Sequence, residues 1–419
     1  MFSITDFLQL THMIIQAFIR IIFTSQDALF FWVIVCLLAM QYGRMQKAKE
    51  AWFGNLGEPV WQHAVKAVAS GLIGGLAGSF LMVFVGINLS DIGLGWLWPL
   101  AIFLMLIHPR FICFSYAGGL ISLGSIIFGI PKVDVPQLMA LVALLHMIEA
   151  MLIYISGHMG ASPVYIKNKQ GQVTGAFNLQ KLWPIPIVAL VVMNIPLDQL
   201  AGSSINMPDW WPLIKPAGNL DPDKLTYVLF PVIAALGYGD LAVTTRPQEK
   251  SKKSSIHLFI FSFVLMSLAV LSSYYKQLAF FAALFSPLGH ELVIWLGQRG
   301  ELGGKPLYIQ SNQGVRILDV FRNSPAAQLG LGSGDLILNV NGKEVNSKTD
   351  FYAALENSWG VVEVEWQKYP NQSFQRNTVR KTLAQDFGII LAPGEYDRPM
   401  VEYSSGGILG RWLRKKMGR

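Results

Sequence analysis

Long apolar runs separated by short polar segments make up most of the chain up to residue 298. Because a membrane-spanning helix needs about 20 mainly apolar residues, this pattern predicts about nine spans, with eight to ten as the range. The predicted spans are 26–42, 65–87, 92–107, 111–130, 134–156, 183–204, 225–242, 256–274 and 277–297. The segment before them, "FLQLTHMIIQAFIRIIF", carries His12 and Arg20 and is either a tenth span or an interfacial helix.

The pattern changes after residue 300, where short alternating segments and turn signals replace the apolar runs. Ser324 before Pro325 is typical of a helix N-cap followed by proline at the first helical position. Asn341-Gly342 is a hairpin-turn dipeptide, and Ser347 with Asp350 resembles a capping box. We therefore expect an α-helical polytopic membrane bundle over 1–298 and a small β-rich α+β domain over 300–392.

Composition supports this division. The chain is 52% hydrophobic and 14% charged, whereas soluble proteins carry roughly a quarter charged residues. Cys36 and Cys113 both lie in apolar runs, which favours buried thiols over a disulfide or a metal motif. The net charge of +7 comes from Lys and Arg beside the spans and from a basic tail within 393–419, so it indicates contact with membrane lipid and not with nucleic acid.

Charge in the short loops predicts an orientation. The loops after 26–42, around Lys167–Lys181 and at 246–253 are basic, whereas the loop 196–223 is acidic. Alternating nine spans places the basic loops on one side, which is the cytoplasmic side of a cell membrane. The soluble domain is then cytoplasmic.

Two overlapping GxxxG patterns lie in one predicted span, formed by Gly71, Gly74, Gly75 and Gly78. Small residues at this spacing let helix backbones approach closely. Packing within the chain is the favoured interpretation, and a homo-oligomer seam is the alternative.

Three polar features within the spans bear on chemistry. His290-Glu291, in "FSPLGHELVIWLG", begins like a zinc-protease motif, but the second histidine that such a motif needs at i+4 is Ile294. We therefore expect no catalytic residue, no metal and no other cofactor here, and a helix break near an interface. His146 and Glu149 share a face in mid-span and predict an intramembrane polar pair. "LGYGDLAVT" at 236–244 lacks the context of a channel filter and predicts a helix end at the cytoplasmic face.

The stretch "SPAAQLGLGSGDLILNVNG" resembles the bacterial form of the PDZ domain that occurs in HtrA-type and site-2-type proteases. The resemblance implies a groove between a strand and the second helix that binds an extended peptide. It assigns the groove to these residues: Lys305, Leu307, Tyr308, Ile309, Phe351, Ala354 and Leu355. The segment 305–310 lacks the family's glycine pattern for a carboxylate loop, so an internal peptide or a groove without a ligand stays open.

Many spans followed by one C-terminal PDZ domain resemble the MinJ-like family of cell-division topological determinants. The features that carry this resemblance are "HPRFICFSYAGGLISL", "DVPQLMALVALLHMIEAMLI" and "ALGYGDLAV". The resemblance implies a non-enzymatic membrane scaffold of the Min system at septa and poles. Its implied partners are a MinD-like ATPase, a DivIVA-like scaffold and other division proteins. A diverged site-2-type protease, a PDZ sensor and a transporter are the alternatives.

Overall fold

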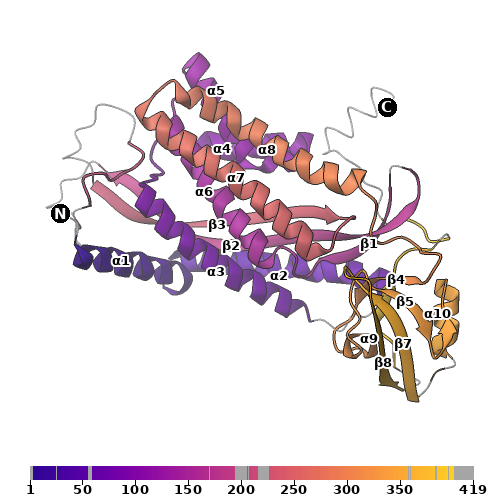
Figure 1. Cartoon of the computed structure of the whole chain (residues 1–419). Coiled ribbons are helices and arrows are strands. Elements are labelled where there is room, and N and C mark those ends of the chain that lie inside the picture. The colour runs from indigo at the N-terminus through magenta and orange to yellow at the C-terminus, as the bar shows by residue number, and fades with distance from the viewer. Residues whose placement is uncertain are drawn as a thin grey trace.

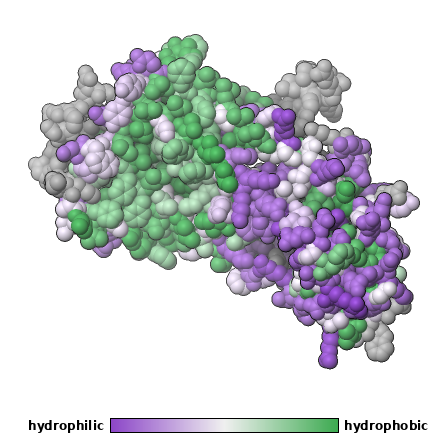
Figure 2. Space-filling view, in the orientation of Figure 1, coloured by the Kyte–Doolittle hydropathy of each residue, from purple (hydrophilic) through white to green (hydrophobic). Residues whose placement is uncertain are grey.

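The computed structural model describes residues 3–24, 26–54, 59–168, 170–193, 205, 207–215, 226–356, 358, 360–382, 385–394 and 396–400. The end of the predicted span 183–204, the parts 196–204, 206 and 216–223 of the acidic loop, and the basic tail from residue 401 lie outside these residues. Helices and one long β-hairpin form an apolar body, and a smaller β-rich unit sits at one end of it (Figure 1). The body is apolar on the visible face and the small unit is mostly polar (Figure 2).

Within the described residues, six helices are long and apolar enough to cross a membrane. They are α1 (Ile4–Phe23), α2 (Gln26–Phe53), α3 (Val60–Val85), α6 (Val135–Ser156), α7 (Pro247–Tyr274) and α8 (Leu278–Gly303). The helical membrane part and the terminal β-rich domain are thus as predicted, and α1 is one of the six candidates.

Two predicted spans correspond to shorter apolar helices. The segments 92–107 and 111–130 contain α4 (Leu94–Ile107) and α5 (Phe114–Phe128), joined through the 3-10 turn η1 (Pro109–Ile112). At about 1.5 Å per residue, each is shorter than the ~30 Å hydrocarbon layer.

The predictions of helices over 183–204 and 225–242 are wrong. Residues Val173–Met193 form strand β2 and residues Thr226–Ala242 form strand β3, paired antiparallel along their common length. The short strand β1 (Ser162–Lys167) pairs with the other edge of β2. "ALGYGDLAV" therefore ends a strand and not a helix. An apolar run has the same hydropathy in a buried strand as in a helix, but prolines within β2 oppose a helix.

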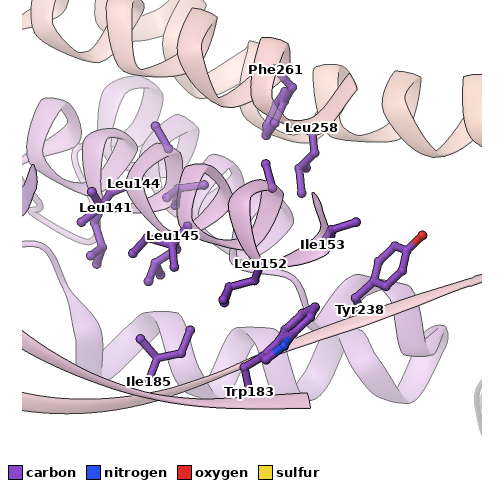
Figure 3. Packing of buried hydrophobic residues seen from close by; sticks show 14 of the residues in the cluster. Leu141, Leu144, Leu145, Leu152, Ile153, Trp183, Ile185, Tyr238, Leu258 and Phe261 are labelled. Atoms are coloured by element: carbon purple, nitrogen blue, oxygen red, sulfur yellow. The ribbon is translucent and has the colours of Figure 1, made fainter. Parts of the chain in front are cut away.

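Helices shield both faces of strand β2 and the part of its edge that β1 leaves unpaired. Trp183 and Ile185 are fully buried, and the Trp183 indole donates a hydrogen bond to Ser156 of α6 at 3.0 Å. On this side the strand meets a layer of leucines from α6, whose far side meets Leu258 and Phe261 of α7 (Figure 3). This covering is required, because irregular or strand backbone at membrane depth persists only where protein buries it.

Beyond its short pairing with β1, the edge of β2 that faces away from β3 packs on α3 through the predicted glycine patterns. A Cβ atom at Gly71 would lie 2.2 Å from the carbonyl oxygen of Pro184, and one at Gly75 would lie 2.1 Å from that of Pro186. Gly74 and Gly78 instead face leucine and isoleucine side chains of α6. Both GxxxG patterns are therefore used for packing within the chain.

The terminal unit is an antiparallel sheet with two helices. Its strands are β4 (Val315–Val320), β5 (Leu336–Val340), β6 (Lys343–Glu344), β7 (Gly360–Lys368), β8 (Ser373–Lys381) and β9 (Ile389–Leu391). The order is β8-β7-β5-β4-β9, with β6 paired to β5. Helix α9 (Pro325–Gln328) begins at Ser324, whose hydroxyl accepts from the Ala327 N–H as the capping pattern predicts. Helix α10 (Lys348–Glu356) covers the core.

One carboxylate fastens the end of α8 to the end of the hairpin. Glu301 is buried and accepts hydrogen bonds from the N–H groups of Val243 and Thr244, at 2.8 and 2.7 Å. It also accepts from the hydroxyls of Thr244 and Thr245. Helix α8 thus continues past residue 297 and fixes where the terminal unit starts.

Candidate peptide groove and intramembrane polar cluster

The segment 305–310, predicted as the groove strand, joins the terminal unit to the hairpin. Tyr308 is fully buried, and its carbonyl accepts from the Gly175 N–H of β2 at 2.8 Å. The Leu307 N–H donates to the carbonyl of Val243 at 2.9 Å. Lys305 is exposed and Ile309 is half-buried. This backbone therefore already pairs with the membrane body at the positions proposed for a peptide.

The three helix residues assigned to the groove lie on the inner face of α10. Phe351 is fully buried, Ala354 and Leu355 are nearly so, and all three belong to the core of the terminal unit. The Phe351 ring packs edge-on against Phe387, which precedes β9, at 5.9 Å between centroids. Helix α10 therefore faces the segment that leads into β9.

Strand β9 is the end strand of its sheet and is the better candidate for the groove strand. It pairs with β4 on one side. Gly388, just before it, has a φ of +79°, and a Cβ atom there would lie 2.1 Å from the Cβ of Ser324, so only glycine fits. Phe387-Gly388-Ile389 has the apolar-glycine-apolar order that was sought at 305–310. That signal, placed after the domain's last long strand, was missed.

Tyr165 of β1 lies between β9 and the start of α10. Its hydroxyl donates to the carbonyl oxygen of Leu391 at 2.8 Å and accepts from the Lys348 ammonium at 3.1 Å. Lys348 also pairs with Asp397, which follows β9. Burial raises the pKa of Tyr165 and the Asp397 carboxylate raises it further, so the hydroxyl stays protonated and can donate. A side chain of the membrane body thus contacts both β9 and the first residue of α10.

The sequence predicts an intramembrane pair of His146 and Glu149, but within the described part of the chain both hydrogen bonds of the His146 ring go to other residues. Its Nδ1 lies 2.7 Å from the carbonyl oxygen of Val142, and its Nε2 lies 3.0 Å from the Cys113 sulfur. Both ring nitrogens therefore meet groups other than Glu149.

The expected helix break at His290 is also wrong, because α8 continues through Pro287 without interruption. His290 lies beside His146, with ring centroids 5.2 Å apart, and Glu291 accepts from the Tyr116 hydroxyl at 2.7 Å. Arg110 forms an ion pair with Glu291 at 3.1 Å. The two residues of the dipeptide thus have different contacts: His290 packs beside His146, and Glu291 bonds to Tyr116 and Arg110.

Residues 297–359 match the PDZ domain family. The terminal unit is a PDZ domain. A crystal structure of the PDZ domain of the SdrC-like protein from Listeria monocytogenes is 22% identical, covers 19% of this chain and 90% of that one, and gives a TM-score of 0.18.

Over 231 residues the chain is 25% identical to the cell division topological determinant MinJ of Bacillus subtilis. The match covers 55% of this chain and 54% of MinJ, so it spans about half the length of that relative. The chain is thus similar to MinJ over part of its length, and it combines candidate membrane helices with a PDZ domain.

Proposed function

We propose that this protein is a non-enzymatic membrane scaffold that recruits division-site selection proteins to septa and poles. The observation that carries the proposal is a PDZ domain joined to a multi-pass membrane body in a chain with similarity to MinJ. The proposed partners are a MinD-like ATPase, a DivIVA-like scaffold and further division proteins. Basic loops beside the spans support a cytoplasmic PDZ domain, where such partners are accessible.

The proposed recruiting surface is the edge of β9 together with α10. A peptide that adds to an end strand gains main-chain hydrogen bonds, and side-chain pockets add selectivity. Tyr165 holds the Leu391 carbonyl on this edge, so a ligand must either leave that contact in place or displace it. This geometry favours a short peptide segment that pairs with β9 and displaces the tyrosine.

The PDZ domain is held on the membrane body by contacts at several points. Besides Tyr165 and Tyr308, the Arg246 guanidinium lies over the Tyr369 ring at 5.0 Å, and Lys49 pairs with Asp319 at 3.8 Å. These contacts restrict how the PDZ domain can move relative to the membrane body, which supports a fixed recruiting surface.

The test is the location of a fluorescent fusion in dividing rod-shaped cells, followed by pull-down of MinD-like and DivIVA-like proteins. We expect enrichment at septa and poles, and loss of at least one partner when residues 300–419 are deleted. Lys348→Ala, beside the proposed groove, is paired with Lys343→Ala on an exposed strand as the control. An even membrane distribution with intact recruitment after the deletion contradicts the proposal.

A further inference from the structure

A cysteine and two histidines meet inside the membrane body. Cys113 lies between η1 and α5, His146 lies in α6 and His290 lies in α8, and one ligand atom from each falls within 4.8 Å of the others. The Cys113 sulfur is 3.0 Å from Nε2 of His146 and 3.6 Å from Nε2 of His290.

These separations match those around a tetrahedral metal ion. Zinc–sulfur bonds of about 2.3 Å and zinc–nitrogen bonds of about 2.1 Å place a thiolate sulfur and an imidazole nitrogen about 3.6 Å apart. The contact to His290 already has this length, and the contact to His146 needs to open by roughly half an ångström.

His146 is oriented as a ligand. Its Nδ1 lies 2.7 Å from the Val142 carbonyl oxygen, one helical turn earlier, so this nitrogen carries the proton and donates. The lone pair of Nε2 then points at the Cys113 sulfur. A backbone carbonyl that holds the non-bonding nitrogen is the usual support of metal-binding histidines.

The described part of the chain meets the polar needs of His290 only partly. Its Nδ1 is buried and has no hydrogen-bond partner among the residues that the structure describes. Its Nε2 has only the long contact to the Cys113 sulfur. Buried polar groups are nearly always satisfied, so Nδ1 is expected to donate to a water molecule; the proton that it then carries leaves the lone pair of Nε2 for an ion.

The surroundings suit an ion of borderline softness. The Phe261 ring lies edge-on to both imidazoles, at 5.4 and 5.7 Å between centroids, and the Tyr116 ring lies against His290 at 5.3 Å. Tyr116 is bonded to Glu291, which pairs with Arg110, and both charged side chains are more than a third exposed. Aromatic rings therefore flank both imidazoles, and the polar chain Tyr116–Glu291–Arg110 lies beside His290 and reaches the surface.

We propose that Cys113, His146 and His290 bind one transition-metal ion, zinc in the first instance. Thiolate and imidazole select zinc or copper(I) over magnesium or calcium. On binding, the Cys113 thiol releases its proton to solvent and forms the metal–sulfur bond, while each neutral imidazole gives one nitrogen lone pair. The ion ties three helical segments together and has a fourth position for water or a further ligand.

Metal content of the full chain, purified in detergent without chelators, tests the proposal. We expect about one zinc ion per chain in the wild type. Cys113→Ser and His290→Ala should lower it about tenfold or more, because each removes one of three ligands. Cys36→Ser and His12→Ala, at an exposed cysteine and an exposed histidine, are the matched controls and should keep the ion.

Cobalt(II) gives an independent readout that does not depend on a variant's yield. The wild type loaded with cobalt should show a thiolate-to-cobalt absorption band that Cys36→Ser retains and Cys113→Ser loses. A stoichiometric ion other than zinc that is lost in the same variants supports the site and changes its occupant. A wild type that takes up no metal under zinc supplementation, or metal retained in Cys113→Ser, overturns the proposal.

Discussion

The close approach of α3 to β2 makes a sharp prediction about Gly75. A methyl group there would lie 2.1 Å from the Pro186 carbonyl oxygen, whereas non-bonded carbon and oxygen atoms need about 3.2 Å. The obstacle is backbone, so Gly75→Ala must push the helix and the strand apart by about 1 Å. The contact between α3 and β2 also loses its hydrogen bond through Ser79, whose hydroxyl accepts from the Val188 N–H at 2.8 Å.

The expected cost follows from two opposing terms. Overpacking costs about 1–3 kcal/mol, and an immovable backbone neighbour places Gly75→Ala at the upper end. Replacing glycine in a helix gains only about 1 kcal/mol. The net destabilisation is about 1–2 kcal/mol, which lowers the midpoint of thermal unfolding by roughly 2–8 °C for a unit of this size.

Gly74→Ala is the matched control, because its nearest neighbour is the flexible end of the Leu152 side chain at 3.1 Å. We expect its midpoint to stay near that of the wild type. The assay is thermal unfolding in detergent, followed by tryptophan fluorescence, since Trp183 is buried beside this seam. Equal midpoints for the two variants, or a lower one for Gly74→Ala, would refute the proposed contact between α3 and β2.

Three further predictions concern the junction with the PDZ domain. Glu301→Ala leaves the N–H groups after β3 without their acceptor and should destabilise the junction between α8 and the hairpin by about 3 kcal/mol. The loss should appear as faster protease cleavage near residue 304, and unchanged cleavage would contradict the role given to Glu301. Tyr165→Phe removes the hydroxyl that bonds the Leu391 carbonyl and should weaken this contact by about 1 kcal/mol. Hydrogen exchange in β9 should become faster and peptide binding there stronger. A weaker peptide affinity would argue against a peptide that displaces Tyr165. Although burial alone would raise it, hydrogen bonds from Lys348 and Gly394 lower the pKa of Asp397, so this contact contributes at neutral pH and is lost as pH falls below about 4. Hydrogen exchange at 396–400 should then rise on acidification in the wild type but not in Lys348→Ala.

Hydropathy predicted the helices well because the bilayer fixes their length and composition. The predicted spans 134–156 and 256–274 fall on α6 and α7, and 277–297 falls on α8. The hairpin could not be separated from helices by hydropathy alone. The prolines of β2 were the local evidence against a helix at that point, and they went unused.

The two sites differ in why they escaped prediction. Cys113 lies 33 residues from His146 and 177 from His290, so no local spacing could reveal the cluster before the helices were packed. The β9 groove did have a local signal at Gly388. The assignment of Lys305 to Ile309 followed the usual order of the PDZ chain, whereas here that segment pairs with the hairpin.

The long hairpin also constrains the order in which the protein is assembled in the bilayer. The middle of α3 packs on Pro184 and Pro186, so β2 lies at membrane depth, where uncovered strand backbone is not tolerated. A helix satisfies the hydrogen bonds of its own backbone, so a single helix can pass from the insertion machinery into the lipid by itself. A single strand cannot, because its backbone groups need a neighbouring strand. Helix α7, which follows the hairpin along the chain and packs on α6, completes the cover. After synthesis, strands β2 and β3 must therefore wait for partners that lie before and after them in the chain before they enter the lipid.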